Sequence, residues 1–174
     1  MSGSGSGSRA DRSYRAVSEG QRILLISVGR RVDERTALAV EAYRRRLPAG
    51  WQWDWVQLPE ASAGSLPVRD VMAREGRRIL ERAEGRLVVA LAEQGVEDDS
   101  LTWAGRFQRF LEQGRPLALV IGGAHGLSPE VLQRADHVWS LSRLTFPHEM
   151  VPLLVAEQIY RAHSILHSHP YHKA

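Results

Sequence analysis

Short, almost wholly apolar runs alternate with longer amphipathic segments from residue 22 onward. The apolar runs are too short for typical helices, and they are typical of strands buried on both faces of a parallel sheet. The expected strands cover residues 23–28, 51–56, 87–91, 117–121 and 138–141. Because helical segments separate them, the sequence predicts an α/β domain with a parallel sheet and helices on both faces.

The amphipathic segments predict helices whose ends carry suitable capping residues. They cover residues 32–47, 68–84, 100–113, a segment that starts at 128, and 149–167. Ser128, Pro129 and Glu130 supply an N-cap, a first-turn proline and a first-turn acid. Ser100 is expected to cap its helix, and Gly85 and Gly114 are expected to end theirs.

Three tryptophans alternate with other residues at positions 51, 53 and 55, so their rings are expected on one face of a strand. Such rings could stack on nucleic-acid bases. Aromatic rings on a strand that helices cover more often belong to a core or to a subunit interface. The core or interface interpretation is favoured, and base stacking stays open.

The chain begins with a Gly/Ser run, MSGSGSGS, which is typical of an artificial linker. Residues 1–21 are therefore expected to form a disordered, tag-like extension, and residues 22–174 a single domain. The arginines at 9, 12 and 15 leave open an arm that contacts phosphate.

Composition indicates the class of protein but does not identify its binding partner. With 43% hydrophobic and 25% charged residues over 174 positions, the chain has the proportions of a soluble globular domain. No apolar run approaches the roughly 20 residues of a transmembrane helix, so no membrane partner is expected. The absence of cysteine excludes disulfides and suits the cytoplasm. A net charge of +3 is too small to indicate a strongly basic face.

Ligands of open parallel sheets bind at the carboxyl ends of the strands, which makes the loops after Leu91, Ile121 and Leu141 the candidates. The glycine turn, residues 122–126, reads Gly-Gly-Ala-His-Gly and lets a ligand approach the backbone closely. It matches neither the P-loop nor the dinucleotide fingerprint, so a simple tight turn stays open. The loop 142–148 mixes apolar side chains with hydroxyls and could hold an adenine-like ring, unless Leu144 and Phe146 merely fill the core.

Four histidines near the C-terminus, His163, His167, His169 and His172, have spacings that could ligate a metal. No cysteine or acid nearby completes such a site, so no metal is expected. A histidine-rich tail is better suited to binding an anion or to proton transfer near neutral pH. A frayed polar terminus is the plainer alternative.

Taken together, these motifs are similar to one family over about 150 residues. The matching segments are Ile26–Gly29, Glu41–Tyr43, Arg46–Leu47, Glu75–Gly76, Ile79–Leu80, Val120–Gly123, Gly126–Pro129, Leu144–His148, Ala156–Gln158, Tyr160–Ala162 and His169–His172. The chain resembles the SPOUT-class bacterial methyltransferases that methylate N3 of a pseudouridine in 23S ribosomal RNA.

The resemblance implies a parallel-sheet SPOUT fold with a C-terminal trefoil knot, S-adenosyl-L-methionine as cofactor, and a homodimer in which one tail completes the partner's site. The partner would be 23S rRNA in the ribosome or large subunit. The implied cofactor residues are Leu91, Gly122, Leu141, Ser142, Arg143, Leu144, Thr145 and Phe146. His148 and Lys173 would bind substrate, His172 or Tyr171 would handle the proton, and Arg161 would give electrostatic support.

The chain departs from the family pattern at a few positions. Residues 91–96 read Leu-Ala-Glu-Gln-Gly-Val where the family usually has L-D-x-x-G-K, His125 replaces an acidic or polar residue, and Pro152 replaces an arginine. Two other functions therefore stay open. One is a non-catalytic dimeric relative that binds ribosomal RNA, and the other is a different α/β enzyme with a nucleotide cofactor.

Overall fold

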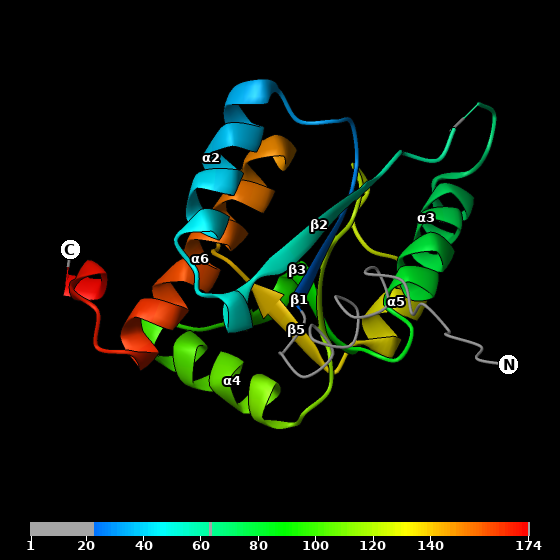
Figure 1. The fold of residues 1–174 in the computed structure, drawn as a ribbon. Helices are drawn as coiled ribbons and strands as arrows, with labels where there is room; N and C mark the ends of the chain where they lie inside the picture. Colours follow the sequence, from blue (N-terminus) through cyan, green and yellow to red (C-terminus); the bar gives the residue numbers. More distant parts are fainter. Residues whose placement is uncertain (1–22, 63, 174) are drawn as a thin grey trace, which may run out of the picture.

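A computed structural model describes residues 23–62 and 64–173, and the expected extension at 1–21 lies outside them. Five parallel strands form one sheet in the order β2-β1-β4-β3-β5, which confirms the predicted α/β class (Figure 1). The strands are β1 (Ile23–Val28), β2 (Trp53–Leu58), β3 (Leu87–Glu97), β4 (Leu117–Ile121) and β5 (His137–Ser140). The predicted trefoil knot is compatible with this order and stays a prediction.

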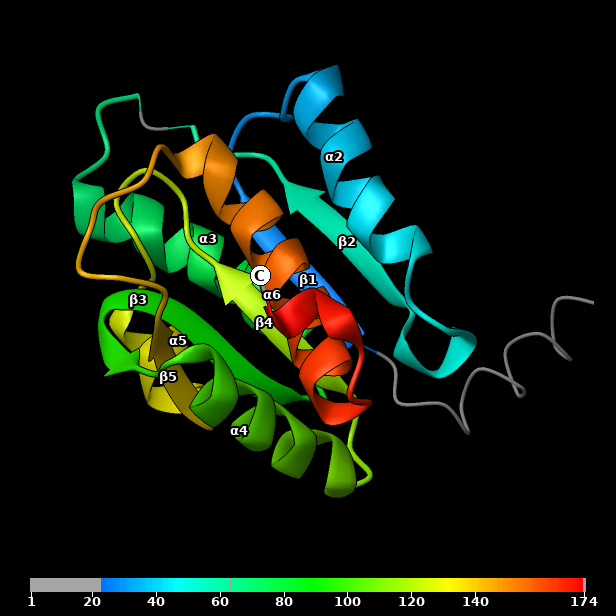
Figure 2. The same cartoon turned by 90° about the vertical axis from the view of Figure 1, so that its left-hand side faces the viewer.

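Helices cover both faces of the sheet. They are α2 (Glu34–Arg45), α3 (Val68–Arg82), α4 (Ser100–Glu112), α5 (Pro129–Arg134) and α6 (Val151–Leu166). Short 3₁₀ turns are η1 (Ala49–Trp51), η2 (His148–Met150) and η3 (Pro170–Lys173). Helices α2, α4 and α6 lie on one face, and α3 and α5 on the other (Figures 1 and 2). Among the described residues, none of these helices combines the length and apolarity needed to cross a membrane.

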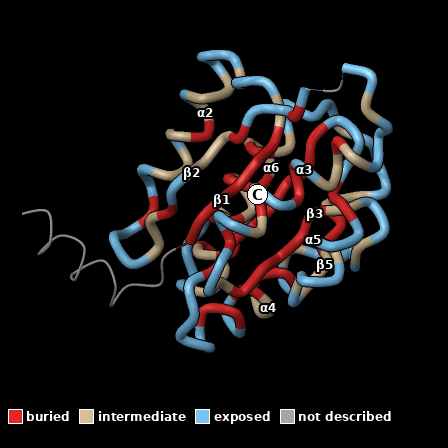
Figure 3. Tube along the Cα trace, turned by 90° about the vertical axis from the view of Figure 1, so that its right-hand side faces the viewer, coloured by how far each residue is buried: buried red, intermediate tan, exposed pale blue. Residues whose placement is uncertain are grey.

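The alternation of side chains along β1 explains why the strands look like uninterrupted apolar runs. Leu25 packs into the core beneath α2, α4 and α6, whereas Leu24 and Ile26 pack beneath α3 and α5. All six residues of β1 are buried, as the red strands of Figure 3 show. Each fully buried aliphatic side chain contributes about 1.5–3 kcal/mol to the free energy of unfolding.

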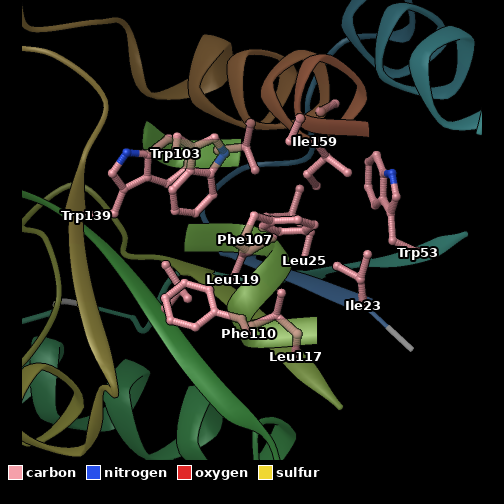
Figure 4. Close-up of a cluster of buried hydrophobic side chains, with 14 of the residues drawn as sticks. Ile23, Leu25, Trp53, Trp103, Phe107, Phe110, Leu117, Leu119, Trp139 and Ile159 are labelled. Atoms are coloured by element: carbon pink, nitrogen blue, oxygen red, sulfur yellow. The ribbon is translucent and has the colours of Figure 1, made fainter. Parts of the chain in front are cut away.

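Aromatic side chains fill the larger core. The rings of Trp103 and Trp139 stack with centroids 3.6 Å apart and planes at 6° (Figure 4). Trp53 is 1% exposed, so the core interpretation holds for this ring. The prediction that Trp51 lies on the same strand is wrong, because the chain turns through η1 before β2 begins. Its ring instead stacks on Phe107, with centroids 5.5 Å apart.

Helix ends follow the predicted chemistry with small shifts. The Oγ of Ser128 accepts a hydrogen bond from the amide of Val131, as a capping serine should. The cap of α4 is Asp99 and not Ser100, because the Asp99 carboxylate accepts the amide of Thr102 at 2.7 Å. The cap that ends α3 is Ala83, and Gly85 adopts a positive φ of 73° two residues later.

Strand β3 continues beyond its predicted end at Leu91. Leu91 and Val96 both pair with Trp139, so residues 92–95 bulge out of the ladder between them. A Cβ on Gly95 would stand 2.6 Å from the carbonyl carbon of Trp139, so only glycine lets the strand return this closely. The polar residues after Leu91 resemble a loop in sequence, which is why the prediction placed the strand end too early.

Candidate cofactor and substrate site

A cavity of about 590 Å³ opens beside the bulge of β3 and at the carboxyl ends of β4 and β5. Its wall combines bulge residues 92–94, the glycine turn 122–126 and the loop after β5. This is the edge where ligands of parallel sheets bind, and the volume lies in the range of small-molecule sites.

The glycine turn folds back on itself and leaves no room for a side chain at Gly122. A Cβ on Gly122 would stand 2.5 Å from the carbonyl carbon of Gly126. The amide of Gly126 donates to the carbonyl of Gly123 at 3.0 Å, and Gly126 has a φ of +82°. The backbone of Gly122 and Gly123, beside Ala124 and His125, therefore lines this side of the cavity, and a ligand can approach the two glycines closely.

The residues predicted to hold the cofactor gather around this cavity. Those that line it are Leu91, Gly122, Leu141, Ser142, Leu144, Thr145 and Phe146, whereas Arg143 is not among the lining residues. Leu144 is 71% exposed, so the alternative that it fills the core is wrong. The loop is shaped by Ser142, whose Oγ accepts the amide of Leu144 at 3.0 Å.

Several lining residues were missed from the sequence. They are Met72 on α3 and Trp139 on β5. Glu93 and Gln94 also line the cavity, and they lie in the predicted ligand loop after Leu91, although the sequence does not single them out as site residues. A glycine followed by a valine at positions 95 and 96 is the one sequence signal that the strand resumes.

His148 lies between the cavity and β1. Its Nε2 contacts the carbonyl oxygen of Val28, which only accepts, so Nε2 carries the proton and Nδ1 is the ring atom left for a ligand. The ring occupies the space beside Gly29, where a Cβ would stand 2.6 Å from Nε2. His148, predicted to bind substrate, is thus fixed in place at the cavity wall.

Arg161 and Tyr171 form a cluster with Glu157 on α6. Arg161 donates to Glu157 Oε1 through Nε at 2.8 Å and lies 2.7 Å from it through a terminal nitrogen. The Tyr171 hydroxyl donates to the same oxygen at 3.1 Å, and the guanidinium lies 5.0 Å from the centre of the Tyr171 ring. The sequence predicted roles for Arg161 and Tyr171 but did not identify Glu157, which joins them.

Burial, with the Tyr43 hydroxyl and Glu157 nearby, raises the pKa of Tyr171. The hydroxyl therefore keeps its proton near neutral pH and acts as a donor. The hydrogen bond that Arg161 donates to Glu157 raises the pKa of Arg161 above its ordinary value. The cluster presents a fixed cation and a neutral phenol.

The cluster does not reach the cavity of its own chain. Val151 lines the cavity at the start of α6, and Arg161 follows ten residues later, which is about 15 Å further along a helix. The backbone of His172 and Lys173 lies in η3, but their side chains are outside the described part of the structure. Within one chain, the predicted cofactor residues therefore lie apart from Arg161 and Tyr171.

The C-terminal histidines pack on aromatic rings. The rings of His163 and His167 stack with centroids 4.2 Å apart, and both meet the edge of Trp51. Within the described residues, no group of three or more histidines and acids is arranged to hold a metal ion.

The cavity suits a ligand with an adenine ring and a polar chain. Leu91, Leu144 and Phe146 offer apolar contact, while Ser142, Thr145 and the bare glycine backbone offer polar groups. The residues present fit S-adenosyl-L-methionine.

Residues 21–172 match a protein family described as predicted SPOUT methyltransferase. The chain belongs to the SPOUT methyltransferase family. It is thus a methyltransferase, and S-adenosyl-L-methionine is the methyl donor of its family. The SPOUT fold expected from the resemblance is confirmed as well.

Relatives of this SPOUT methyltransferase carry one name, ribosomal RNA large subunit methyltransferase H. The protein from Alkalilimnicola ehrlichii is 44% identical over 154 residues, which cover 88% of this chain and 99% of the relative. The protein from Methylobacillus flagellatus is 38% identical over 153 residues, with 87% and 99% covered. A crystal structure titled probable methyltransferase, from Bordetella pertussis, shares the fold with a TM-score of 0.52 and 15% identity over 85% of this chain and 98% of that one.

Proposed function

We propose that this SPOUT methyltransferase transfers a methyl group from S-adenosyl-L-methionine to N3 of a pseudouridine in 23S ribosomal RNA. The observation that carries the proposal is the cavity, which is built by the bulge of β3 and by the loops at the carboxyl ends of β4 and β5. The names of relatives 37–44% identical to the chain support the ribosomal substrate. A ribosomal substrate implies a cytoplasmic location.

The chemistry requires alignment and removal of one proton. When bound, the cofactor supplies an electrophilic methyl on a sulfonium, which leaves as a neutral thioether. N3 of the base loses its proton as the new N–C bond forms, so a base or a cation must support the nitrogen. We assign proton handling to His172, because Tyr171 is held as a donor, and we assign electrostatic support to Arg161.

The separation along α6 supports a site shared between two subunits. Arg161 follows the cavity-lining Val151 by ten residues, about 15 Å along α6, and Tyr171 in η3 contacts Glu157 on the same helix. Neither Arg161 nor Tyr171 lines the cavity of its own chain. In a homodimer, the tail of one subunit would bring these residues and the side chains of His172 and Lys173 to the partner's cavity. His148 would then meet the substrate from the cavity side.

The substrate is expected to be an assembled ribosomal surface. A net charge of +3 gives little long-range attraction for free RNA, so shape and local contacts must contribute to recognition. We expect methylation of ribosomes or large subunits and much slower methylation of isolated 23S rRNA.

Incubation with ribosomes and methyl-labelled S-adenosyl-L-methionine tests the function. Label in N3-methylpseudouridine after digestion is the expected result. Unlabelled ribosomes, with the protein still bound to them, would favour the non-catalytic RNA-binding alternative. Calorimetry with the cofactor separates the cases, because the alternative predicts no binding.

Subunit complementation tests the shared site. Gly122→Ala should disable the cavity and His172→Ala the tail, so each variant alone should be inactive. If tails act across the dimer, mixing and re-equilibrating equal amounts should restore about a quarter of wild-type turnover, since half the dimers are mixed and each has one intact site. No recovery would place each tail in its own chain's site.

A further inference from the structure

One buried carboxylate takes no part in the chemistry described above. Glu75 lies on α3 and is 4% exposed. Its Oε1 accepts the amide of Ala61 at 3.0 Å, which ties the loop after β2 to the helix. Its Oε2 is buried and has no hydrogen-bond partner among the described residues. An unpartnered buried carboxylate oxygen is costly and requires an explanation.

The free oxygen is directed at the glycine turn. A Cβ on Gly123 would stand 2.7 Å from Glu75 Oε2 and 3.2 Å from its carboxyl carbon. The carboxylate therefore fills the space that a side chain at 123 would need. Gly123 itself lines the cavity, as does Met72 one helical turn before Glu75. Only the backbone of the glycine turn separates the carboxylate from the ligand space at this point.

The hydrogen bond with Ala61 accounts for only one of the two carboxylate oxygens of Glu75. One acceptor oxygen is enough for that hydrogen bond, and a neutral glutamine would supply it equally well. The tie gives no reason for a second, charged oxygen behind a wall of bare backbone. A ligand with a positive charge at that wall gives one, because two opposite charges attract strongly where water is excluded.

We propose that Glu75 makes the cavity distinguish the cationic methyl donor from its neutral product, an inference that rests on the proposed use of S-adenosyl-L-methionine. The donor carries a sulfonium, and the product S-adenosyl-L-homocysteine has lost that charge with the methyl group. The carboxylate behind Gly123 favours the first and adds nothing to the second. Product therefore leaves more readily than donor, which limits product inhibition.

The test compares dissociation constants for donor and product by calorimetry. Glu75→Gln removes the charge and keeps the shape and the acceptor for Ala61. We expect the variant to bind the donor roughly ten-fold more weakly and the product with less than a two-fold change. Glu81→Gln, an exposed position on the same helix, is the matched control and should change neither constant.

Equal weakening of both ligands by Glu75→Gln would show that Glu75 only holds the turn, and an unchanged donor affinity would also overturn the proposal. Unmodified protein gives a second measurement if the variant does not fold. It should bind the donor more tightly than the product, and the reverse order would refute the inference. Failure of unmodified protein to bind either ligand would instead refute the cofactor assignment.

Discussion

His148 and Gly29 share one space at the end of β1. The histidine ring lies where the side chain of any other residue at position 29 would project, and its Nε2 donates to the carbonyl of the preceding residue, Val28. Gly29 also has a φ of +149°, which side-chain-bearing residues rarely adopt. The position of a residue assigned to the substrate thus depends on a glycine far from it in sequence.

Gly29→Ala should therefore displace His148 and destabilise the fold. We expect a loss of about 1–3 kcal/mol in the free energy of unfolding, from backbone strain and overpacking together. Urea titration measures it. Gly50→Ala, which has open space around the added methyl, is the matched control and should change stability little.

Gly95→Ala should disrupt the cavity wall more severely. The added methyl would meet backbone atoms of Trp139 and Ser140 at 2.6–2.8 Å, and backbone cannot rotate away. We expect a loss of about 2 kcal/mol or more in unfolding free energy and a large drop in affinity for S-adenosyl-L-methionine. Unchanged affinity would show that the bulge is not part of the cofactor site.

Gly105→Ala should have the opposite effect. Gly105 lies inside α4, and a Cβ there would meet nothing within 4 Å. Alanine has the higher helix propensity, so we expect a gain of about 0.5–1 kcal/mol with no change in cofactor affinity. Thermal unfolding checks the gain, and a lower melting temperature would contradict it.

Tyr171→Phe should preserve most of the turnover. The raised pKa of the hydroxyl keeps it protonated, so its loss removes a donor to Glu157 but no base. We expect about a ten-fold decrease at most, because this part-buried hydrogen bond of 3.1 Å belongs at the low end, about 1.5 kcal/mol, of the range for bonds to a charged group. A changed pH–rate profile would return the proton-handling role to Tyr171.

Stability should fall on mild acidification, in part because of His163. Burial, with the charges of His167 and His169, lowers the pKa of His163 below its ordinary 6.5 in the folded state. The unfolded chain then takes up the proton first, so stability that is fully present above pH 6.5 is lost as the pH falls toward the folded-state pKa. His163→Gln should flatten this pH dependence in denaturant titrations, and an unaltered slope would exclude His163 as its source.

The fold was predictable where a strand is buried on both faces, because such a strand is a continuous apolar run in the sequence. In β1, the side chains alternate between two cores. The end of β3 was not predictable, because its last residues are polar and pair with β5 only through backbone. The glycine turn and the loop after β5 could be placed at one edge because the strands were predicted to be parallel, so that their carboxyl ends meet at the same edge. Glu75 could not be assigned a role, because its relation to Gly123 exists only once α3 packs beneath the turn.

The double pairing of Trp139 with Leu91 and Val96 has a practical consequence. Residues 92–94 line the cavity between two points that are each anchored in the sheet, so their side chains can be exchanged without loss of the strands that carry them. That short stretch is where a library aimed at bulkier alkyl donors is best introduced, with Gly95 left unaltered as its hinge.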